Sequence, residues 1–170
     1  MTMLNIAASQ SAGSFSELTG ILEGDVQPNA VDLRLGKVFA INHEALFTID
    51  EEQKKHRGST PVEVGEDGYW YLHPGHYEVI MENTITVAEG EAGFVITRSI
   101  LNRNGVFLTS GLYDSGYSGV MAGVMHVSVG PMKIKPGTRI GQYLSWKAQS
   151  LHMYDGDYGA GKEHDKKYEG

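Results

Sequence analysis

The stretch "TRSILNRNGVFLTSGLYDSGYSGVMAGVMHV", residues 97–127, decides the fold class. Short runs rich in Val, Phe, Thr, Tyr and Met alternate in it with glycines. β-branched and aromatic residues favour strands, and glycine favours the tight turns between them. The same pattern continues outward in "AVDLRLGKVFAI", "YWYLHPGHYEVIMENTITV" and "MKIKPGTRIGQYLSW". Many short strands separated by frequent turns predict an all-β sandwich or barrel.

The length and composition favour one domain. A chain of 170 residues with 41% hydrophobic content is large enough for one compact core and leaves little room for a second. We expect this domain to cover residues 1–155. The remaining segment "GDYGAGKEHDKKYEG", residues 156–170, has no hydrophobic period, which predicts a flexible C-terminal tail in the free protein.

Two local patterns stand apart from the strands. "SFSELTGILEG", residues 14–24, predicts the one short N-terminal helix, because Ser14 and Glu17 have capping-box spacing. Its apolar residues share one helix face: Phe15, Leu18, Ile21 and Leu22. "DEEQKKHRGSTP", residues 50–61, is charged and nearly free of apolar residues, which predicts a solvated loop.

Charge and residue usage exclude several classes of protein. With 14 Lys+Arg against 21 Asp+Glu, the net charge of -7 argues against nucleic acid as a partner. The chain has no cysteine, which excludes disulfides and thiolate metal sites. It begins without a basic and apolar leader, and no apolar run approaches the roughly 18 residues that span a membrane. We therefore expect a soluble, cytoplasmic protein with no membrane partner.

Five motifs in order carry a resemblance over nearly the whole chain from about residue 25. They are "DVQPNAVDLRLG", "LHPGHYEVIMENTITV", "TRSILNRNGVF", "GLYDSGYSG" and "KPGTRIGQYLSW". In this order they resemble the trimeric dUTPase and dCTP deaminase superfamily. The resemblance implies a distorted β-barrel or jelly-roll subunit of the dUTPase-like β-clip type, and a homotrimer with active sites between subunits.

The two branches of that superfamily differ in one carboxylate. The deaminase branch carries a glutamate in the strand after the aspartate hairpin, where it shuttles protons between water and the cytosine amine. Val124 occupies that place here, and a valine carries no proton. The resemblance therefore favours the hydrolase branch, although "QPNAVDLRLG" and "KKYEG" look more like the deaminase branch.

The hydrolase branch uses the hairpin aspartate, which is Asp114 in this chain. The resemblance implies that Asp114 is catalytic and activates a water for attack on the α-phosphorus of dUTP, giving dUMP and pyrophosphate. From the residues alone, support of the glycine turn is the favoured role for Asp114, since Asp beside Gly commonly has this role. Two alternatives stay open: a dCTP deaminase, possibly bifunctional, in which another residue replaces the missing glutamate, and a non-catalytic nucleotide-binding or regulatory homologue.

The nucleoside contacts follow from the same motif. Tyr117 matches the tyrosine whose ring lies under the sugar and excludes a 2′-hydroxyl. The resemblance implies base recognition by the hairpin backbone of Leu108, Thr109, Ser110, Gly111 and Leu112. Gly105 and Gly111 are expected to permit the reversal of the chain there.

The phosphate contacts lie in other motifs. Arg98, Ser99 and Gln142 match the phosphate-binding residues of the family, and Arg103 matches an arginine of its deaminase-like members. Mg²⁺ is the expected cofactor, held by the phosphates of the substrate and by water and not by direct protein ligands. Asp32 matches the first family motif and is assigned either a role in positioning metal-bound water or a structural role.

The C-terminal tail departs from the family pattern, because the usual glycine-rich motif with an aromatic cap is absent. Tyr168 in "KKYEG" is a candidate to stack on the base in its place, with Lys162 and Lys167 approaching the phosphates. Ile100 stands where a small or hydroxyl residue usually follows the arginine-serine pair.

Overall fold

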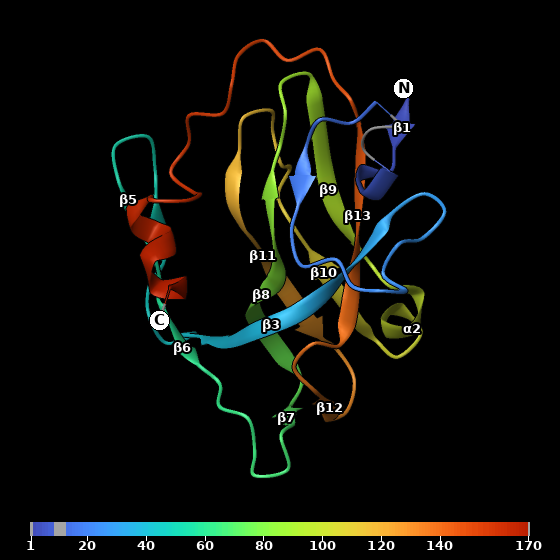
Figure 1. Ribbon diagram of the computed structural model, residues 1–170. Helices are drawn as coiled ribbons and strands as arrows, with labels where there is room; N and C mark the ends of the chain where they lie inside the picture. The colour runs from blue at the N-terminus through green and yellow to red at the C-terminus, as the bar shows by residue number, and fades with distance from the viewer. Residues whose placement is uncertain (1, 9–12, 170) are drawn as a thin grey trace.

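The computed structural model describes residues 2–8 and 13–169, and over these ranges it is mostly β-sheet (Figure 1). The all-β prediction is therefore confirmed. The strands are β1 (Met3–Leu4), β2 (Glu17–Leu18), β3 (Val31–Ile41), β4 (Thr48–Ile49), β5 (Lys54–Lys55), β6 (Ser59–Pro61), β7 (Trp70–Leu72), β8 (Gly75–Thr86), β9 (Glu91–Thr97), β10 (Val106–Thr109), β11 (Ser118–Val127), β12 (Met132–Ile134) and β13 (Arg139–Lys147). The short helices are η1 (Ile6–Ala8), α2 (Ser99–Asn102) and η2 (Glu163–Tyr168).

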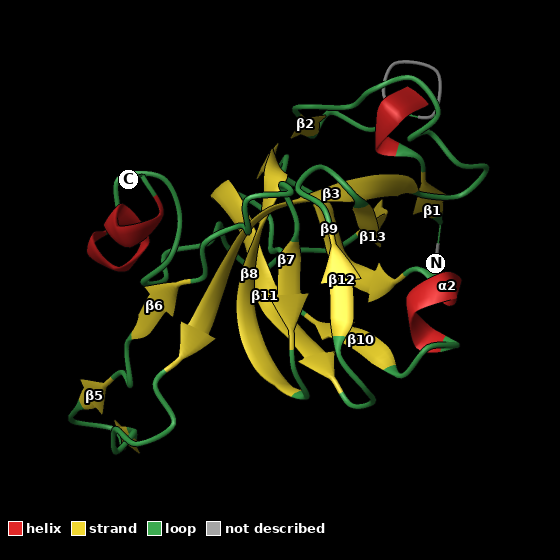
Figure 2. Ribbon diagram, turned by 90° about the horizontal axis from the view of Figure 1, so that it is seen from below, coloured by secondary structure: helices red, strands yellow, loops and turns green. Residues whose placement is uncertain are grey.

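One curled sheet forms the body of the molecule (Figures 1 and 2). Its strand order is β1-β13-β3-β8-β11-β10, with β2 added to β8, β6 to β3 and β9 to β13. The first half of β3 pairs with β13 and the second half pairs with β8, so β3 joins the two sides of the curl. Every pairing is antiparallel, as short connections without crossover helices require.

Alternation along the strands fills the core inside this curl. In β3 the side chains of Val31, Leu33 and Leu35 are fully buried, and in β11 Met121 and Met125 are fully buried. Residues two apart in a strand project from the same face, so these side chains meet inside the sheet. The outward face of β3, β8 and β11 is left for other contacts, and it carries the functional region described below.

Among the glycines of the sheet, Gly93 of β9 is the one at which an added Cβ atom would come closest to the backbone of a neighbouring strand. A Cβ atom added there would lie 2.5 Å from the backbone oxygen of Leu144 and still nearer to the Tyr143 hydroxyl. Tyr143 is 1% exposed and has no room to move aside. Only glycine therefore fits at this position.

We expect Gly93→Ala to lower the free energy of unfolding by about 3 kcal/mol, because overpacking against backbone cannot be relieved by a side-chain rotation. Urea denaturation monitored by tryptophan fluorescence would measure the loss. Gly111→Ala is the matched control, since a Cβ there meets nothing within 4 Å. Equal midpoints for the two variants would contradict the packing described for Gly93.

The helix predicted over residues 14–24 is wrong. This segment is extended: Leu18 of β2 pairs with Ile85 of β8, and a turn follows at residues 23–24. Ser14 does not cap a helix, because its hydroxyl donates to buried Glu91 at 2.7 Å. The Ser16 hydroxyl donates to the same carboxylate at 2.5 Å. Satisfying a buried carboxylate outweighs the weak local preference for a helix.

The solvated loop predicted over residues 50–61 is only partly correct. Its side chains are exposed except for half-buried Ser59, but Lys54 and Lys55 form β5 and pair with β4. Ser59 to Pro61 form β6 on the edge of β3. This segment stands out from the sheet and forms one side of the cavity described next.

Among residues 2–8 and 13–169, no helix is long and apolar enough to cross a membrane.

Candidate functional site

A cavity of about 610 Å³ lies on the outward face of β8 and β11, beneath the C-terminal tail. The hairpin after β10, the two strands, the 41–58 segment and the tail all contribute to its walls. The predicted site residues that line it are Gly111, Leu112, Tyr117, Lys167 and Tyr168. The structure therefore brings two of the five expected base residues, the expected sugar residue and two of the three expected tail residues to one cavity.

Tyr117 combines a packing role with a place in the cavity wall. Its side chain is 7% exposed, and its hydroxyl donates to the carbonyl of Val120 at 2.7 Å. Its ring packs edge-on against Tyr113 and Tyr154, with centroids 5.4 Å away in each case. Burial raises the pKa of the Tyr117 hydroxyl, so the group stays neutral. The ring is therefore a rigid, apolar wall of fixed orientation.

The tail packs on the barrel through Tyr168. This side chain is 6% exposed and contacts Phe39 and Ile80 on the outward face of the sheet. The Lys37 ammonium donates to the Tyr168 carbonyl at 2.6 Å. Figure 1 shows η2 lying beside β5 and β6. The mobility expected for residues 156–170 in the free protein stays a prediction.

Glu78 of β8 connects the tail to the cavity wall. Its carboxylate accepts from Ser59 at 2.7 Å, from the Lys167 ammonium at 2.9 Å and from the Tyr168 hydroxyl. Burial raises the pKa of Glu78, but the hydrogen bonds from Tyr168, Ser59 and Lys167 outweigh burial, and the net pKa is lowered. The cavity therefore contains an ionised carboxylate at neutral pH.

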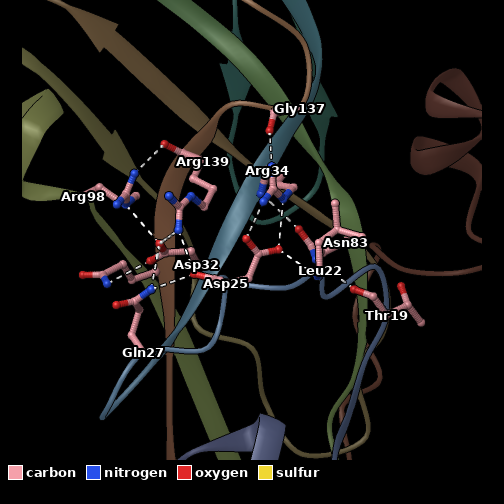
Figure 3. A network of polar contacts seen from close by, with 12 residues as sticks. Thr19, Leu22, Asp25, Gln27, Asp32, Arg34, Asn83, Arg98, Gly137 and Arg139 are labelled. Carbon is pink, nitrogen blue, oxygen red and sulfur yellow. Dashed lines mark hydrogen bonds and ion pairs between the residues drawn. The ribbon is translucent and has the colours of Figure 1, made fainter.

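A second group of predicted residues meets at Asp32, whose side chain is fully buried. Gln142 donates to Asp32 Oδ1 at 3.0 Å. Arg98 Nε lies 3.2 Å from Asp32 Oδ2 (Figure 3). Arg139 Nη1 lies 3.3 Å from the same Oδ2. These residues come from β3, β13 and the start of α2, and none of them lines the cavity. Two guanidinium groups beside one carboxylate favour the structural role for Asp32 over a role near a metal cation.

A buried ion pair supports this cluster from one side (Figure 3). Arg34 of β3 donates to both oxygens of buried Asp25, at 2.9 Å and 2.6 Å. Burial raises the pKa of Asp25, but the hydrogen bonds from Arg34 and from the N–H of Leu22, together with the nearby guanidinium charges, outweigh burial and the net pKa is lowered. A bidentate pair of this kind fixes the strand geometry around Asp32.

The remaining candidate side chains lie on the surface. Asp114 is exposed, directly beside cavity-lining Tyr113. Ser99 and Arg103 are exposed at the two ends of α2. Lys162 lies outside the cavity lining, 3.9 Å from Asp155.

The residues of the hairpin predicted to bind the base lie in different environments. Leu108 points into the core at 8% exposure, and its N–H donates to the Thr97 hydroxyl. Thr109 is exposed beside His126, and the Ser110 hydroxyl accepts from the N–H of Val95. Only the end of the predicted hairpin reaches the cavity.

The glycine expectation for this hairpin is half correct. Gly105 has a φ of 70°, as a tight reversal requires. Gly111 lies outside the left-handed region, and Gly116, with a φ of 88°, makes the turn after Asp114 instead.

Sequence reasoning missed Glu78 and Arg139 as members of these two groups. Glu78 had a signal, because it is an acidic residue within the largely apolar run "HYEVIM". Arg139 stands three residues before Gln142 in the same quoted motif. Both are recognised only when the strand pairings are known.

Comparison with known proteins gives the family. The family model described as dCTP deaminase-like matches residues 4–147. A probable deoxyuridine 5′-triphosphate nucleotidohydrolase of Halobacterium salinarum is 32% identical over 143 residues, covering 81% of this chain and 85% of the relative. A dUMP-forming dCTP deaminase of Pseudarthrobacter chlorophenolicus is 32% identical over 151 residues, covering 85% of this chain and 77% of the relative.

Solved structures agree on the fold. The 2′-deoxycytidine 5′-triphosphate deaminase of Agrobacterium tumefaciens superposes with a TM-score of 0.64 at 17% identity, over 88% of this chain and 49% of that one. The present chain thus spans about half of that protein. EIAV dUTPase superposes with a TM-score of 0.51 at 15% identity, over 84% and 97% of the two chains. The prediction of a dUTPase-like barrel is confirmed, and the chain belongs to the dCTP deaminase-like family, in which the relatives named here are dUTP nucleotidohydrolases and dCTP deaminases.

Proposed function

We propose that this protein hydrolyses dUTP to dUMP and pyrophosphate, with Asp114 as the general base. The observation that carries this is the convergence of Arg98 and Gln142, from separate motifs, on the carboxylate of Asp32. An oriented guanidinium and an oriented amide side by side suit phosphate oxygens. The kinship with the Halobacterium nucleotidohydrolase supports the same reaction.

The cavity is the proposed nucleoside site. Tyr117 offers a buried, uncharged ring against which deoxyribose packs, and the backbone of Gly111 and Leu112 offers donors and acceptors to the base. A site that hydrogen-bonds its substrate rejects analogues lacking the matching group by large factors. This part of the site would therefore decide which base and sugar are accepted.

Asp114 would take a proton from the attacking water. Its carboxylate is exposed at the turn between Tyr113 and Tyr117, where solvent reaches it. General base assistance of this kind contributes about 10²- to 10⁴-fold to the rate. The oxygen of that water forms the new bond to the α-phosphorus as the bond to the pyrophosphate oxygen breaks.

Assembly as a homotrimer would complete the site. Among the described residues, the proposed phosphate-binding cluster around Asp32 and the nucleoside cavity have no residue in common, so phosphate and nucleoside contacts would come from different subunits. Phe94 and Ile96 of β9, both more than a third exposed, add apolar surface opposite Leu144 and Gln142 of β13. Exposed apolar surface beside the cluster around Asp32 supports a subunit interface there.

Magnesium would be carried into the site by the substrate. The described residues contain no group of three or more side chains able to hold a metal ion, and Asp32 is paired with arginines. Arg98 and Gln142 are hydrogen-bond donors, and donors of this kind fit a triphosphate whose own oxygens bind Mg²⁺. When bound, the ion would supply the charge neutralisation that Arg98 and Gln142 leave incomplete.

The test is a substrate panel. The protein would be incubated with magnesium and each of dUTP, dCTP, dTTP and UTP, and pyrophosphate and ammonia would be measured separately. We expect pyrophosphate from dUTP and much less from UTP. Nucleotide binding without any product would reject hydrolysis and favour a non-catalytic, regulatory homologue.

A dUMP-forming dCTP deaminase is the second candidate function. The Pseudarthrobacter relative, which is 32% identical over 151 residues of this chain, favours it. Its chemical requirement is a carboxylate that replaces the glutamate missing at Val124.

Removing residues 156–170 should raise KM for dUTP about tenfold or more, because the tail supplies Lys167 and Tyr168 to the cavity. Steady-state kinetics of the truncated protein would measure this, with circular dichroism to establish that the barrel remains folded. An unchanged KM in a folded truncated protein would show that the tail does not contribute to substrate binding.

A further inference from the structure

The Glu78 carboxylate lies in the cavity directly opposite Val124, the position at which the deaminase branch carries its glutamate. Val124 of β11 is paired with Glu78 of β8 in the antiparallel register. Residues directly opposite in such a pair project from the same face, with Cβ atoms about 4.5–5.5 Å apart. Both residues line the cavity, next to Gly111 and Leu112 of the hairpin. A carboxylate on β8 can therefore reach the space that a longer side chain at position 124 would reach.

We propose that Glu78 carries protons in a second reaction of this cavity, the deamination of the cytosine ring of dCTP, which rests on the proposed placement of the nucleobase beside Gly111 and Leu112. The other acidic residue in the cavity lining, Asp165, is turned into the tail, where it accepts from the N–H of Gly159 at 2.8 Å. Glu78 is thus the carboxylate that belongs to the wall of the barrel.

The reaction balances with one water. The Glu78 carboxylate takes a proton from water while the water oxygen bonds to C4 of the ring. Glu78 then passes that proton to N3. It then takes the second proton from the C4 hydroxyl and gives it to the exocyclic nitrogen. The C4–N4 bond breaks, ammonia leaves and the C4 oxygen becomes the carbonyl of uracil. The products are dUTP and ammonia, and Glu78 is again an ionised carboxylate.

The surroundings of Glu78 suit this role once a base enters. In the structure its oxygens accept from Ser59, Lys167 and Tyr168, and two of these donors belong to the tail. If the entering nucleotide takes over the Lys167 and Tyr168 donors, Glu78 loses two hydrogen bonds while its burial remains, and its pKa moves upward from its lowered value. A carboxylate with a pKa nearer to neutrality both accepts and returns a proton more readily.

The contrasting explanation is that Glu78 only anchors the tail. The two roles differ in which product they affect. An anchor acts on any nucleotide held under the tail, so its loss would lower both pyrophosphate release from dUTP and ammonia release from dCTP by similar factors. A proton carrier acts on the cytosine ring, so its loss would lower ammonia release further.

The experiment measures ammonia from dCTP and pyrophosphate from dUTP with the full chain and magnesium. We expect ammonia from the unmodified protein, and Glu78→Gln should lower its release about 10²- to 10⁴-fold, at least tenfold more than it lowers pyrophosphate release. Gln keeps the size of the side chain and its acceptor oxygen. Ser59→Ala is the matched control, because it removes a hydrogen bond to the same carboxylate and leaves the proton carrier in place; its ammonia release should fall less than tenfold.

Two results would overturn the role of Glu78: no ammonia from dCTP, or equal losses of both products in Glu78→Gln. The first, with pyrophosphate still released from dUTP, leaves the proposed hydrolysis intact. Ammonia release that depends on Glu78 without pyrophosphate release from dUTP would reject the hydrolysis and keep the deamination.

Discussion

Replacing Asp114 with asparagine should lower pyrophosphate release from dUTP by about 10²- to 10⁴-fold, the usual contribution of a general base. Asparagine has nearly the same shape and still accepts a hydrogen bond, but it takes no proton from water. Because the side chain is exposed at a turn, its replacement should cost little stability. The loss should therefore appear in kcat, with dUTP binding retained.

Asp67→Asn is the matched control for this variant. Asp67 is also an exposed aspartate in a glycine turn, where its carboxylate is 3.0 Å from Lys133 and accepts from the Tyr71 hydroxyl. It lies outside the cavity lining and the Asp32 cluster, so its variant should keep the unmodified rate. If Asp114→Asn kept more than a tenth of that rate, the aspartate would be a turn residue and hydrolysis would need another base.

The strand pattern of the barrel could be predicted from sequence because it depends on local alternation. The run at residues 30–41 becomes β3 and the stretch at 97–127 contains β10 and β11, since β-branched and apolar residues bounded by glycine have few other stable arrangements. The N-terminal segment could not be predicted this way. Its serines satisfy Glu91, which lies 77 residues from Ser14 in the chain, and a local capping pattern holds no information about that partner.

Several residues of the candidate site could be predicted from the sequence, but the contacts between them could not. The resemblance named Arg98, Gln142 and Asp32 separately, and the pairing of β3 with β13 brings Gln142 opposite Asp32. The partnership of Glu78 with Val124 depends on register. A shift between Val120 and Ala122 sets which residues of β8 and β11 meet, and a bulge of this kind changes register without a strong sequence signal.

Asp32 tests whether the phosphate contacts are oriented by the protein or by the metal. We expect Asp32→Asn to raise KM for dUTP roughly tenfold or more, because Arg98 and Gln142 lose the charged partner that holds them toward the substrate. Loss of one hydrogen bond to a charged group costs about 1.5–3 kcal/mol, which corresponds to at least this change in affinity. The effect on kcat should be smaller, since Asp32 acts as a positioning residue.

Stability must be separated from positioning, because removing one charge from a buried pair destabilises a protein strongly. Asp25→Asn provides the comparison: Asp25 is as buried as Asp32, but it pairs with Arg34 and not with Arg98 or Gln142. Both variants should unfold at lower urea concentration, and only Asp32→Asn should raise KM. If Asp32→Asn instead lowered kcat and shifted the magnesium concentration needed for activity, with KM unchanged, Asp32 would act through metal-bound water. The two guanidinium groups within 3.3 Å of its carboxylate argue for the first outcome, because they would repel a cation placed at the same oxygens.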